Sequence, residues 1–315
     1  MLLLTTLLSG FVTWLLLCRL IPFLTRNLID KPNSRSSHFV ETPSGGGGVF
    51  VLIGTLGVCF LGNSIPLICL PLATIGFIDD WYQLPSNLRF GGQVFTAVLL
   101  LLLSPLSKTI LNLYSFPLTI LIYLVLIFFA TALINFTNFM DGMDGLIGGC
   151  MAIILSVAAL TNHAILPLVG ALIGFVLLNW SPAKVFMGDV GSTFLGGVFV
   201  GLILEATTWQ RGIGLLLVAT PILSDAFVCL CRRTIAKQPI FKAHRLHLYQ
   251  RLHQAGWSHS HVSLLYVMAT FLLAISYLLI DQWPLLIFIL VVLELSFGYW
   301  LDKNQAVSFD LSINT

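Results

Sequence analysis

The pair Asp79-Asp80 ends an apolar run in the sequence GFIDDW and is a first candidate for chemistry. Two adjacent carboxylates repel each other, so a divalent cation or a cationic partner is expected to offset their charge. The same proximity can raise the pKa of one of them enough for it to act as a base. A solvated loop would also tolerate the pair, and the pair alone leaves both interpretations open.

A second group of oxygen ligands lies in the segment NFTNFMDGMDG, residues 135–145. If a helix continues through it, Asn138, Asp141 and Asp144 recur every three residues and share one face. Hard oxygen ligands at this density suit Mg²⁺, with Mn²⁺ as the alternative ion, and do not suit zinc. The competing interpretation is a turn, rich in Asn and Asp, that caps two helices.

Asp189 lies in the sequence FMGDVGS, where the next apolar run begins. It could cap that helix, and the same helix start offers free N–H groups to a phosphate. A carboxylate there opposes an anion unless a cation lies between them. A magnesium ion between Asp189 and a diphosphate would remove this conflict.

A cationic segment, KAHRLHLYQRLH at residues 242–253, contains His244, Arg245 and His247. Basic residues beside a membrane often set topology or contact anionic lipids. The histidines, and an arginine able to bind in bidentate fashion, favour phosphate recognition as well. Acids that hold a metal, together with cations that hold phosphates, are the components of a phosphoryl-transfer site.

These groups belong to a chain that is too apolar for a soluble protein. Of its 315 residues, 15 are Lys or Arg and 13 are Asp or Glu, so 9% are charged, while 57% are hydrophobic. An ordinary soluble domain has about 25% charged residues. The composition excludes a cytosolic enzyme, a disordered protein and a nucleic-acid binder with a basic surface. It predicts a polytopic membrane protein, in line with the mean hydropathy of +0.97.

We expect an all-α integral membrane protein with about eleven transmembrane helices in a single domain, residues 1–315. The first apolar run lacks a positive flank and a small-residue cleavage site, which favours a span over a removable signal peptide. A span needs about 20 mostly apolar residues. The expected spans centre on residues 2–22, 48–62, 64–79, 92–104, 117–135, 145–161, 164–179, 191–205, 212–230, 261–280 and 284–300.

The distribution of basic residues predicts the orientation. With the N-terminus outside, thirteen Lys and Arg residues fall on the cytoplasmic side and only Lys108 and Arg211 fall outside. Positive charge accumulates on the cytoplasmic side, so this orientation, with a cytoplasmic C-terminus, is predicted. Most acids lie at the ends of apolar runs on the same face, where burial is costly and usually tied to function. We therefore expect the active site on the cytoplasmic face.

The motifs GFIDDW, NFTNFMDGMDGL, FMGDVGS and AHRLHLYQRL, in this order, resemble those of the polyprenyl-phosphate N-acetylhexosamine-1-phosphate transferase superfamily, glycosyltransferase family 4. The segment DKPNSRSSHFVETPSGGGG is similar to the family's first cytoplasmic loop, and the resemblance covers residues 25–260. The last motif looks closest to the branch that initiates O-antigen, lipopolysaccharide or related surface glycans in cell wall biogenesis.

The resemblance implies a reaction in the bacterial inner membrane. Undecaprenyl phosphate attacks the β-phosphate of a UDP-N-acetylhexosamine, UMP leaves, and the sugar-1-phosphate stays on the lipid. The implied partners are this donor, this acceptor and membrane lipids, without nucleic acid, and a homodimer is compatible with the sequence. Whether the transfer is direct or proceeds in two steps is left open.

The resemblance also implies residue roles. Asn138 and Asp189 match the Mg²⁺ ligands. Asp144 matches a uracil contact, and Phe186 matches a ring that stacks on uracil. The substrate-binding set is completed by Arg245 and His244, and the implied catalytic residues are Asp79, Asp80, Asp141 and His247. One of the Asp79-Asp80 pair would deprotonate the lipid phosphate, Asp141 would order the site, and Arg245 with His247 would hold the diphosphate.

Two departures and three alternatives remain. In the first departure, the lysine that some branches have shortly after the acidic pair is missing, and Arg89 could substitute for it. In the second, the segment 232–260 is too short for a separate sugar-reading domain, so the sequence does not determine the sugar. The alternatives are the phospho-MurNAc-pentapeptide transferase of peptidoglycan synthesis, whose triple-histidine motif is missing here, a membrane transporter, and a non-catalytic scaffold.

Several other residues carry expectations without an assigned reaction. Asp225 follows Pro221 inside a predicted span and could brace Arg245 or Arg233. The glycine run 45–48 lacks the lysine of a phosphate-binding loop, so we expect it to be flexible or closely packed. The cysteines lie in apolar runs without metal-ligand spacing and are expected to be small buried residues; they are Cys18, Cys59, Cys69, Cys150, Cys229 and Cys231.

Overall fold

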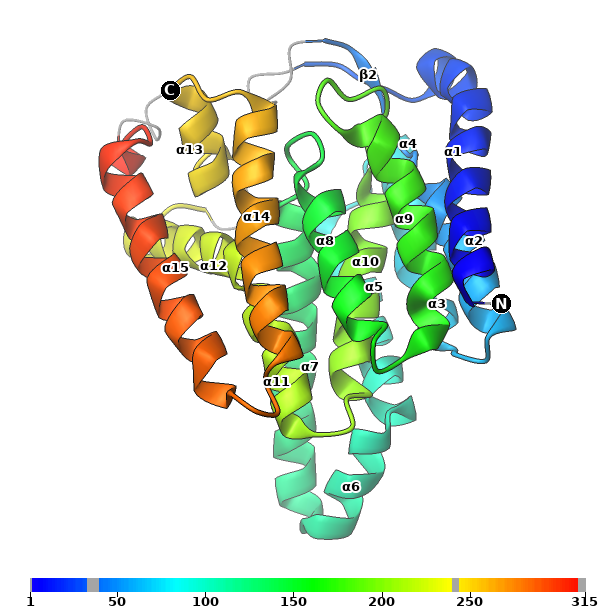
Figure 1. The fold of residues 1–315 in the computed structure, drawn as a ribbon, viewed down its shortest axis with the longest axis vertical. Coiled ribbons are helices and arrows are strands. Elements are labelled where there is room, and N and C mark those ends of the chain that lie inside the picture. Colours follow the sequence, from blue (N-terminus) through cyan, green and yellow to red (C-terminus); the bar gives the residue numbers. More distant parts are fainter. Residues whose placement is uncertain (1, 33–39, 240–243, 311–315) are drawn as a thin grey trace.

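The computed structural model describes residues 2–32, 40–239 and 244–310, and Figure 1 shows that these form a bundle of helices with one short hairpin. The helices are α1 Leu2–Asn27, α2 Gly47–Phe60, α3 Ile65–Ile68, α4 Leu70–Tyr82, α5 Ser86–Leu103, α6 Pro105–Leu113, α7 Phe116–Phe139, α8 Leu146–Ala158, α9 Leu166–Asn179 with the 3₁₀ turn η1 His163–Ile165 before it, α10 Asp189–Leu204, α11 Trp209–Val218, α12 Thr220–Ile235, α13 Leu248–Gln254, α14 His259–Leu278 and α15 Pro284–Asn304. The strands are β1 Ile29–Asp30 and β2 Thr42–Pro43.

Apolar composition and helix-start chemistry explain these elements. A chain inside a bilayer must satisfy its own backbone, which a helix does within one segment. Proline lies in the first turn of α3, α4, α6, α7, α9, α12 and α15, where its missing N–H costs nothing. Ser104 caps α6 by accepting a hydrogen bond from the Ser107 N–H at 3.3 Å.

The expected number of spans is met only in part. All eleven predicted runs are helical, but only five described helices, α1, α5, α7, α14 and α15, are long and apolar enough to cross a membrane. The pair α11 and α12, bent by 71°, gives a sixth span if it is taken as one. The helices α2, α8, α9 and α10 are apolar but shorter. The protein is therefore a multi-pass membrane protein, and the count of eleven and the orientation stay predictions.

The helix α10 is the central element of the bundle. Nearly all of its residues are buried, and it packs against α4, α7, α2 and α5. Close approach depends on glycine: a Cβ added at Gly196 would lie 2.8 Å from the Ile134 Cα of α7. Small residues at such contacts let membrane helices approach each other. As a result, the first turn of α10 lies among the ends of its neighbours.

The glycine run 45–48 is a close-packed junction. The Gly46 N–H donates to the Phe186 carbonyl at 3.0 Å, and the Gly47 N–H donates to the Met187 carbonyl at 2.9 Å. A Cβ added at Gly47 would lie 2.7 Å from the Gly191 Cα. Of the two interpretations offered for this run, close packing is therefore the correct one. The run fixes the segment that precedes α10.

One end of the bundle gathers the elements that matter for chemistry. Figure 1 shows β2 and α13 on this side. The hairpin pairs Ile29 with Pro43 and Asp30 with Thr42 in antiparallel fashion. Residues 33–39 and 240–243, which include part of the similar first loop and Lys242, lie outside the described residues.

The helix α15 is attached at the same end by charged groups. Asp302 accepts hydrogen bonds from Arg232 of α12, at 2.9 and 2.6 Å, and also contacts Arg251 of α13. An apolar cavity of about 600 Å³ lies between α12, α14 and α15. The ion pairs therefore hold α12, α13 and α15 together at the polar end.

The prediction that all cysteines are buried is wrong for part of the set. Cys69, Cys150 and Cys229 are buried, Cys59 and Cys231 are partly buried, and Cys18 is exposed on α1. The apolar surroundings of Cys18 in the sequence did not require burial within the protein, because a membrane helix can turn apolar residues toward lipid. All six are free thiols.

Candidate active site

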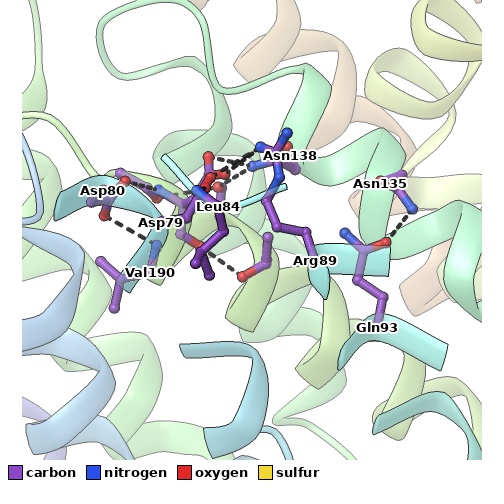
Figure 2. A network of polar contacts seen from close by, with 12 residues as sticks. Asp79, Asp80, Leu84, Arg89, Gln93, Asn135, Asn138 and Val190 are labelled. Atoms are coloured by element: carbon purple, nitrogen blue, oxygen red, sulfur yellow. Dashed lines mark hydrogen bonds and ion pairs between the residues drawn. The ribbon is translucent and has the colours of Figure 1, made fainter. Parts of the chain in front are cut away.

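The Asp80 carboxylate caps the N-terminus of α10 from another helix. Its Oδ1 accepts a hydrogen bond from the Asp189 N–H at 2.9 Å, and its Oδ2 accepts one from the Val190 N–H at 3.4 Å (Figure 2). These N–H groups lack partners within α10, and its dipole favours a negative charge there. The sequence suggested that Asp189 might cap its own helix, but a residue 109 positions earlier supplies the cap.

Two glycines make this contact sterically feasible. A Cβ at Gly188, where φ is +74°, would lie 3.0 Å from the Asp80 Cγ. A Cβ at Gly76, on α4, would lie 2.5 Å from both the Asp189 carbonyl carbon and the Val190 nitrogen. The neighbours of Gly76 are backbone atoms, so no side-chain rotation could relieve the overlap there. The end of α4 therefore lies directly against the start of α10.

Asp79 faces a different set of groups from Asp80. Its Oδ1 accepts a hydrogen bond from the Leu84 N–H at 2.5 Å, and its Oδ2 pairs with the Arg89 Nη1 at 3.0 Å. The same Arg89 nitrogen lies 3.4 Å from the Asp189 Oδ2 (Figure 2). Arg89 therefore links two of the predicted acids through one guanidinium group.

The Asn138 amide is held against α10. Its Nδ2 donates to the Asp189 Oδ1 and to the Ser192 Oγ, each at 2.9 Å. Ser192 was not among the predicted site residues, although it lies one turn after Asp189 in FMGDVGS. One turn before Asn138, the Asn135 Nδ2 donates to the Gln93 Oε1 of α5 at 2.7 Å. The contacts of Asn138 hold its side chain beside Asp189.

Asp141 completes a crowded group of carboxylates. Burial raises the pKa of Asp141 to about 8, and the charges of Asp189 and Asp80 add to the rise. Asp79, Asp80, Asp141 and Asp189 thus share one site, and Arg89 is the ion-pair partner that the described residues provide for it. An excess of hard oxygen donors and negative charge fits a divalent cation such as Mg²⁺.

The condition under which Asn138, Asp141 and Asp144 would share one helix face is not met. The helix α7 ends at Phe139, and a left-handed glycine, Gly145 with φ +72°, starts α8. The chain therefore leaves helical geometry between these residues, and Asp141 and Asp144 lie in the turn. The segment is therefore a turn between two helices.

Asp144 faces a separate pair of partners. Its Oδ2 accepts a hydrogen bond from the Ala183 N–H at 3.2 Å, and its Oδ1 lies 3.2 Å from the His259 Nδ1. Burial opposes the charged carboxylate, but the contact with His259 outweighs it and lowers the pKa of Asp144. His259 is the first residue of α14, and its contact with Asp144 was not anticipated from the sequence. Asp144 thus lies beside the segment that carries Phe186.

Phe186 is fixed through its backbone. Its N–H donates to the Pro43 carbonyl at 2.8 Å, and its own carbonyl accepts from Gly46. The neighbouring Val185 carbonyl accepts from the Asn179 Nδ2 at 3.0 Å, while the Asn179 Oδ1 accepts from the Gly145 N–H at 3.0 Å. The Phe186 segment and the Asp144 turn are therefore joined through Asn179, a residue that the sequence did not single out.

The cationic segment begins α13. His247 is the N-cap residue of this helix, and its ring stacks on that of His244 with centroids 5.0 Å apart. The Arg245 carbonyl accepts a hydrogen bond from the Gln254 Nε2 at 2.9 Å. Ligand-capable atoms of His244, His247 and Cys229 all lie within 4.8 Å of one another, a group that the sequence spacing did not reveal.

Asp225 pairs with a histidine, and the expectation that it braces Arg245 or Arg233 is not met. Its Oδ1 lies 3.5 Å from the His247 Nδ1. Burial opposes a charged ring, but Asp225, together with Cys229, raises the pKa of His247 to about 9. Burial, followed by the charges of His247 and Arg233, lowers the pKa of His244 to about 3. One histidine is therefore charged near neutral pH and its neighbour is neutral.

One tyrosine joins the cationic segment to the end of α7, the helix that carries Asn138. The Tyr249 hydroxyl of α13 donates to the carbonyl of Phe139, the last residue of α7, at 3.3 Å. A Cβ at Gly142 would lie 3.2 Å from the Tyr249 Cζ, so glycine leaves room for this ring. The carboxylates at the end of α4, in the turn after α7 and at the start of α10 thus lie near the cationic segment. This arrangement belongs to a multi-pass membrane protein and gathers acidic and basic side chains at one end of its bundle.

Comparison with known proteins identifies the family. The model for glycosyl transferase family 4 matches residues 63–207. A probable undecaprenyl-phosphate N-acetylglucosaminyl 1-phosphate transferase of Bacillus subtilis is 29% identical over 295 residues, which cover 84% of this chain and 82% of that protein. A phospho-N-acetylmuramoyl-pentapeptide-transferase of Staphylococcus haemolyticus is 30% identical over 304 residues, covering 82% of this chain and 92% of that one.

A phospho-N-acetylmuramoyl-pentapeptide-transferase of Nostoc sp. is 31% identical over 277 residues, covering 74% of this chain and 73% of that protein. The chain belongs to the polyprenyl-phosphate N-acetylhexosamine-1-phosphate transferase superfamily, whose members are sugar-phosphate transferases. Relatives with two different donors match about equally well, so the similarity does not distinguish the branches.

Proposed function

We propose that the protein transfers an N-acetylhexosamine-1-phosphate from a UDP-sugar to undecaprenyl phosphate and releases UMP, initiating a lipid-linked surface glycan of the O-antigen type. The observation that carries the proposal is the contact between α13 and the end of α7, next to Asn138, because the transfer needs a cation site near a phosphate site. The reaction takes place at the cytoplasmic face of the bacterial inner membrane, with the N-terminus outside.

The cluster at the start of α10 fits Mg²⁺, with Mn²⁺ as the alternative ion. Asn138 and Asp189 would supply oxygen ligands, because their side chains are in contact and the two Asn138 hydrogen bonds use its amide nitrogen, which leaves the amide oxygen for the ion. A bound Mg²⁺ supplies charge stabilisation to the diphosphate and to the departing UMP. Arg89 keeps Asp79 and Asp189 together and offsets part of their repulsion.

Asp79 is the member of the acidic pair that we assign to deprotonation of the lipid phosphate. Both oxygens of Asp80 accept main-chain N–H groups of α10, which gives Asp80 a structural task. The Asp79 Oδ2, in contrast, meets the Arg89 guanidinium, whose side chain is 41% exposed and can exchange partners. Asp141 orders the site from the turn after α7.

The donor is held by two further groups. Asp144 contacts uracil and Phe186 stacks on it, and both are positioned by the junction at Asn179. His247 and Arg245, with His244 beside them, hold the diphosphate for in-line attack. A charged His247 next to a neutral His244 provides one strong donor toward an anion without two adjacent charges.

The second candidate is transfer of phospho-MurNAc-pentapeptide, because relatives with that name match at 30% and 31% identity. The two candidates differ in the donor, since the second donor carries a peptide. A test with several donors therefore separates them.

The test is lipid-dependent UMP release by the purified protein with Mg²⁺ and undecaprenyl phosphate. The donors are UDP-GlcNAc, UDP-GalNAc and UDP-MurNAc-pentapeptide. Release with an N-acetylhexosamine donor supports the proposal, and release only with the pentapeptide donor favours the second candidate. Asp281→Asn is a matched control, because Asp281 pairs with Arg211, one of the two basic residues predicted to lie outside. No release with any donor, from folded protein that binds its ligands, would refute both.

A further inference from the structure

Asp225 is a buried carboxylate with an unusually full set of partners. It lies on α12, just after the bend that separates α11 from α12, and is only 6% exposed. Its Oδ1 accepts a hydrogen bond from the Leu248 N–H at 2.7 Å. Its Oδ2 accepts one from the Tyr249 N–H at 3.1 Å and one from the Tyr266 hydroxyl at 2.7 Å. None of the roles proposed above uses Asp225.

These contacts join three segments that are distant in the sequence. Leu248 and Tyr249 form the first turn of α13, where N–H groups need acceptors from outside the helix. Tyr266 belongs to α14 and fixes the carboxylate from the other side. The start of α13 is therefore held to α12 by one charged group, and a neutral side chain at position 225 would hold it less strongly.

The same carboxylate faces the edge of the His247 ring. At 3.5 Å, the Asp225 Oδ1 and the His247 Nδ1 form a close ion pair rather than a short hydrogen bond. A carboxylate at Nδ1 fixes the orientation of an imidazole and directs its Nε2 away from the carboxylate. His247 also stacks between His244 and Tyr249, with centroid distances of 5.0 and 5.6 Å. The ring is thus restrained on an edge and on its faces.

We propose that Asp225 is a positioning residue for the transfer reaction: it holds His247 with Nδ1 toward α12 and presents Nε2 to the diphosphate of the donor. This proposal rests on the proposed function. It extends that function by adding a residue that does not touch substrate and that acts through His247.

Asp225 also sets the distance between the phosphate site and the acid cluster. Tyr249, whose N–H is bound by Asp225, donates its hydroxyl to the Phe139 carbonyl, next to Asn138. A displacement of α13 would therefore move both His247 and this contact. One carboxylate thus fixes the cationic segment relative to the end of α7.

The charge on His247 depends on identifiable neighbours. Asp225 and Cys229 face it from α12, His244 from the segment before it and Tyr249 from α13, while Tyr266 of α14 binds Asp225 from behind. The pKa of about 9 expected for His247 depends largely on Asp225. Loss of the negative charge at position 225 should therefore lower the pKa of His247, so that the ring loses its proton at a lower pH than in the wild type.

The test compares Asp225→Asn with the wild type in the UMP-release assay between pH 6 and pH 10. We expect kcat to fall by about tenfold or more, and the alkaline limb of the kcat profile to move from near pH 9 to a pH at least one unit lower. Tyr266→Phe is the matched variant, because it removes one hydrogen bond to Asp225 and leaves the charge. It should keep the alkaline limb near pH 9.

A double-mutant cycle links the two residues. If Asp225 acts through His247, Asp225→Asn should cost little more when His247→Gln is already present. Additive losses, or an alkaline limb that stays near pH 9 in Asp225→Asn, would overturn the proposal. Asp225→Glu keeps the charge, and its alkaline limb should stay above that of Asp225→Asn even if the longer side chain lowers kcat.

A direct titration separates this proposal from the proposed function. Ring-nitrogen NMR of histidine-labelled protein, with the His247 signal assigned by its loss in His247→Gln, should give a midpoint near pH 9 that falls by at least one pH unit in Asp225→Asn. An unchanged midpoint overturns the pairing, whether or not the protein is active. If the wild type releases no UMP with any donor, the proposed function fails and the reaction role of Asp225 fails with it, while the titration still decides whether Asp225 holds His247.

Discussion

Gly76→Ala offers a sharp test of how α4 positions the site. The added methyl group would lie 2.5 Å from the Val190 nitrogen and from the Asp189 carbonyl carbon, where ordinary contacts begin at 3.4 Å. Relief requires α4 and α10 to separate by about 1 Å, because only backbone atoms are in the way. The hydrogen bond from the Asp189 N–H to Asp80, now 2.9 Å long, would then exceed hydrogen-bonding distance.

The expected cost follows from this displacement. A shift of about 1 Å in a catalytic arrangement can lower activity about 100-fold. Overpacking of this kind typically lowers the free energy of unfolding by about 1–3 kcal/mol. Alanine is otherwise the better helix former by about 1 kcal/mol, so a loss of stability must come from the contact with α10.

The assay is UMP release, with thermal unfolding measured on the same preparations. Gly91→Ala and Gly298→Ala are matched controls, because a Cβ at either position meets no atom within 4 Å. Both should retain the activity and the unfolding temperature of the wild type. If Gly76→Ala kept more than half of the wild-type kcat, the close approach of α4 to α10 would not be what positions Asp80 and Asp189.

Three further predictions concern charged groups of the site. Asp189→Ala should abolish turnover through loss of the metal, as measured by a Mg²⁺ titration, and wild-type turnover at ordinary Mg²⁺ would contradict the assignment. Arg89→Lys should lower kcat about tenfold, because an ammonium group is a poorer bridge between two carboxylates. Its free energy of unfolding should change by less than about 1 kcal/mol, since the Arg89 side chain is 41% exposed. An unchanged kcat would argue against the bridge. The pKa of His247, raised to about 9, implies that the stabilisation from its pairing with Asp225 is complete below about pH 6.5 and is lost as the pH rises through 9. It is worth about 3 kcal/mol, and the difference in unfolding temperature between wild type and Asp225→Asn, measured from pH 6 to pH 10, should become smaller toward the alkaline end.

Much of the architecture could be predicted from local sequence. Long apolar runs must become helices inside a bilayer, because no water is available to bind the backbone. The ends of those runs hold the ionisable residues, so the motifs GFIDDW and FMGDVGS indicate where α4 ends and α10 begins. The spacing of the apolar runs does not indicate how many helices cross the membrane fully, because short helices such as α8 and α10 depend on their neighbours for burial.

The candidate site residues could be chosen from the sequence, but their partners could not. Residue type marks an acid at a helix end as costly and therefore informative. Asp80 binds the N-terminus of a helix 109 residues away, and no local pattern encodes that contact. Likewise, the turn at Gly145 removes Asp144 from the face of Asn138, although the spacing of the three residues fits a helix.

The sequence by itself determined that this is a helical membrane protein of a known transferase family with acids and cations at the ends of its apolar runs. Composition and short motifs are local properties, so they are visible in the sequence before any fold is known. Only the tertiary structure decided that Asp80 caps α10, that Arg89 links Asp79 to Asp189, and that Asp225 holds His247. These pairings depend on how closely helices approach, and glycines such as Gly76 set that distance through contacts between segments far apart in the chain.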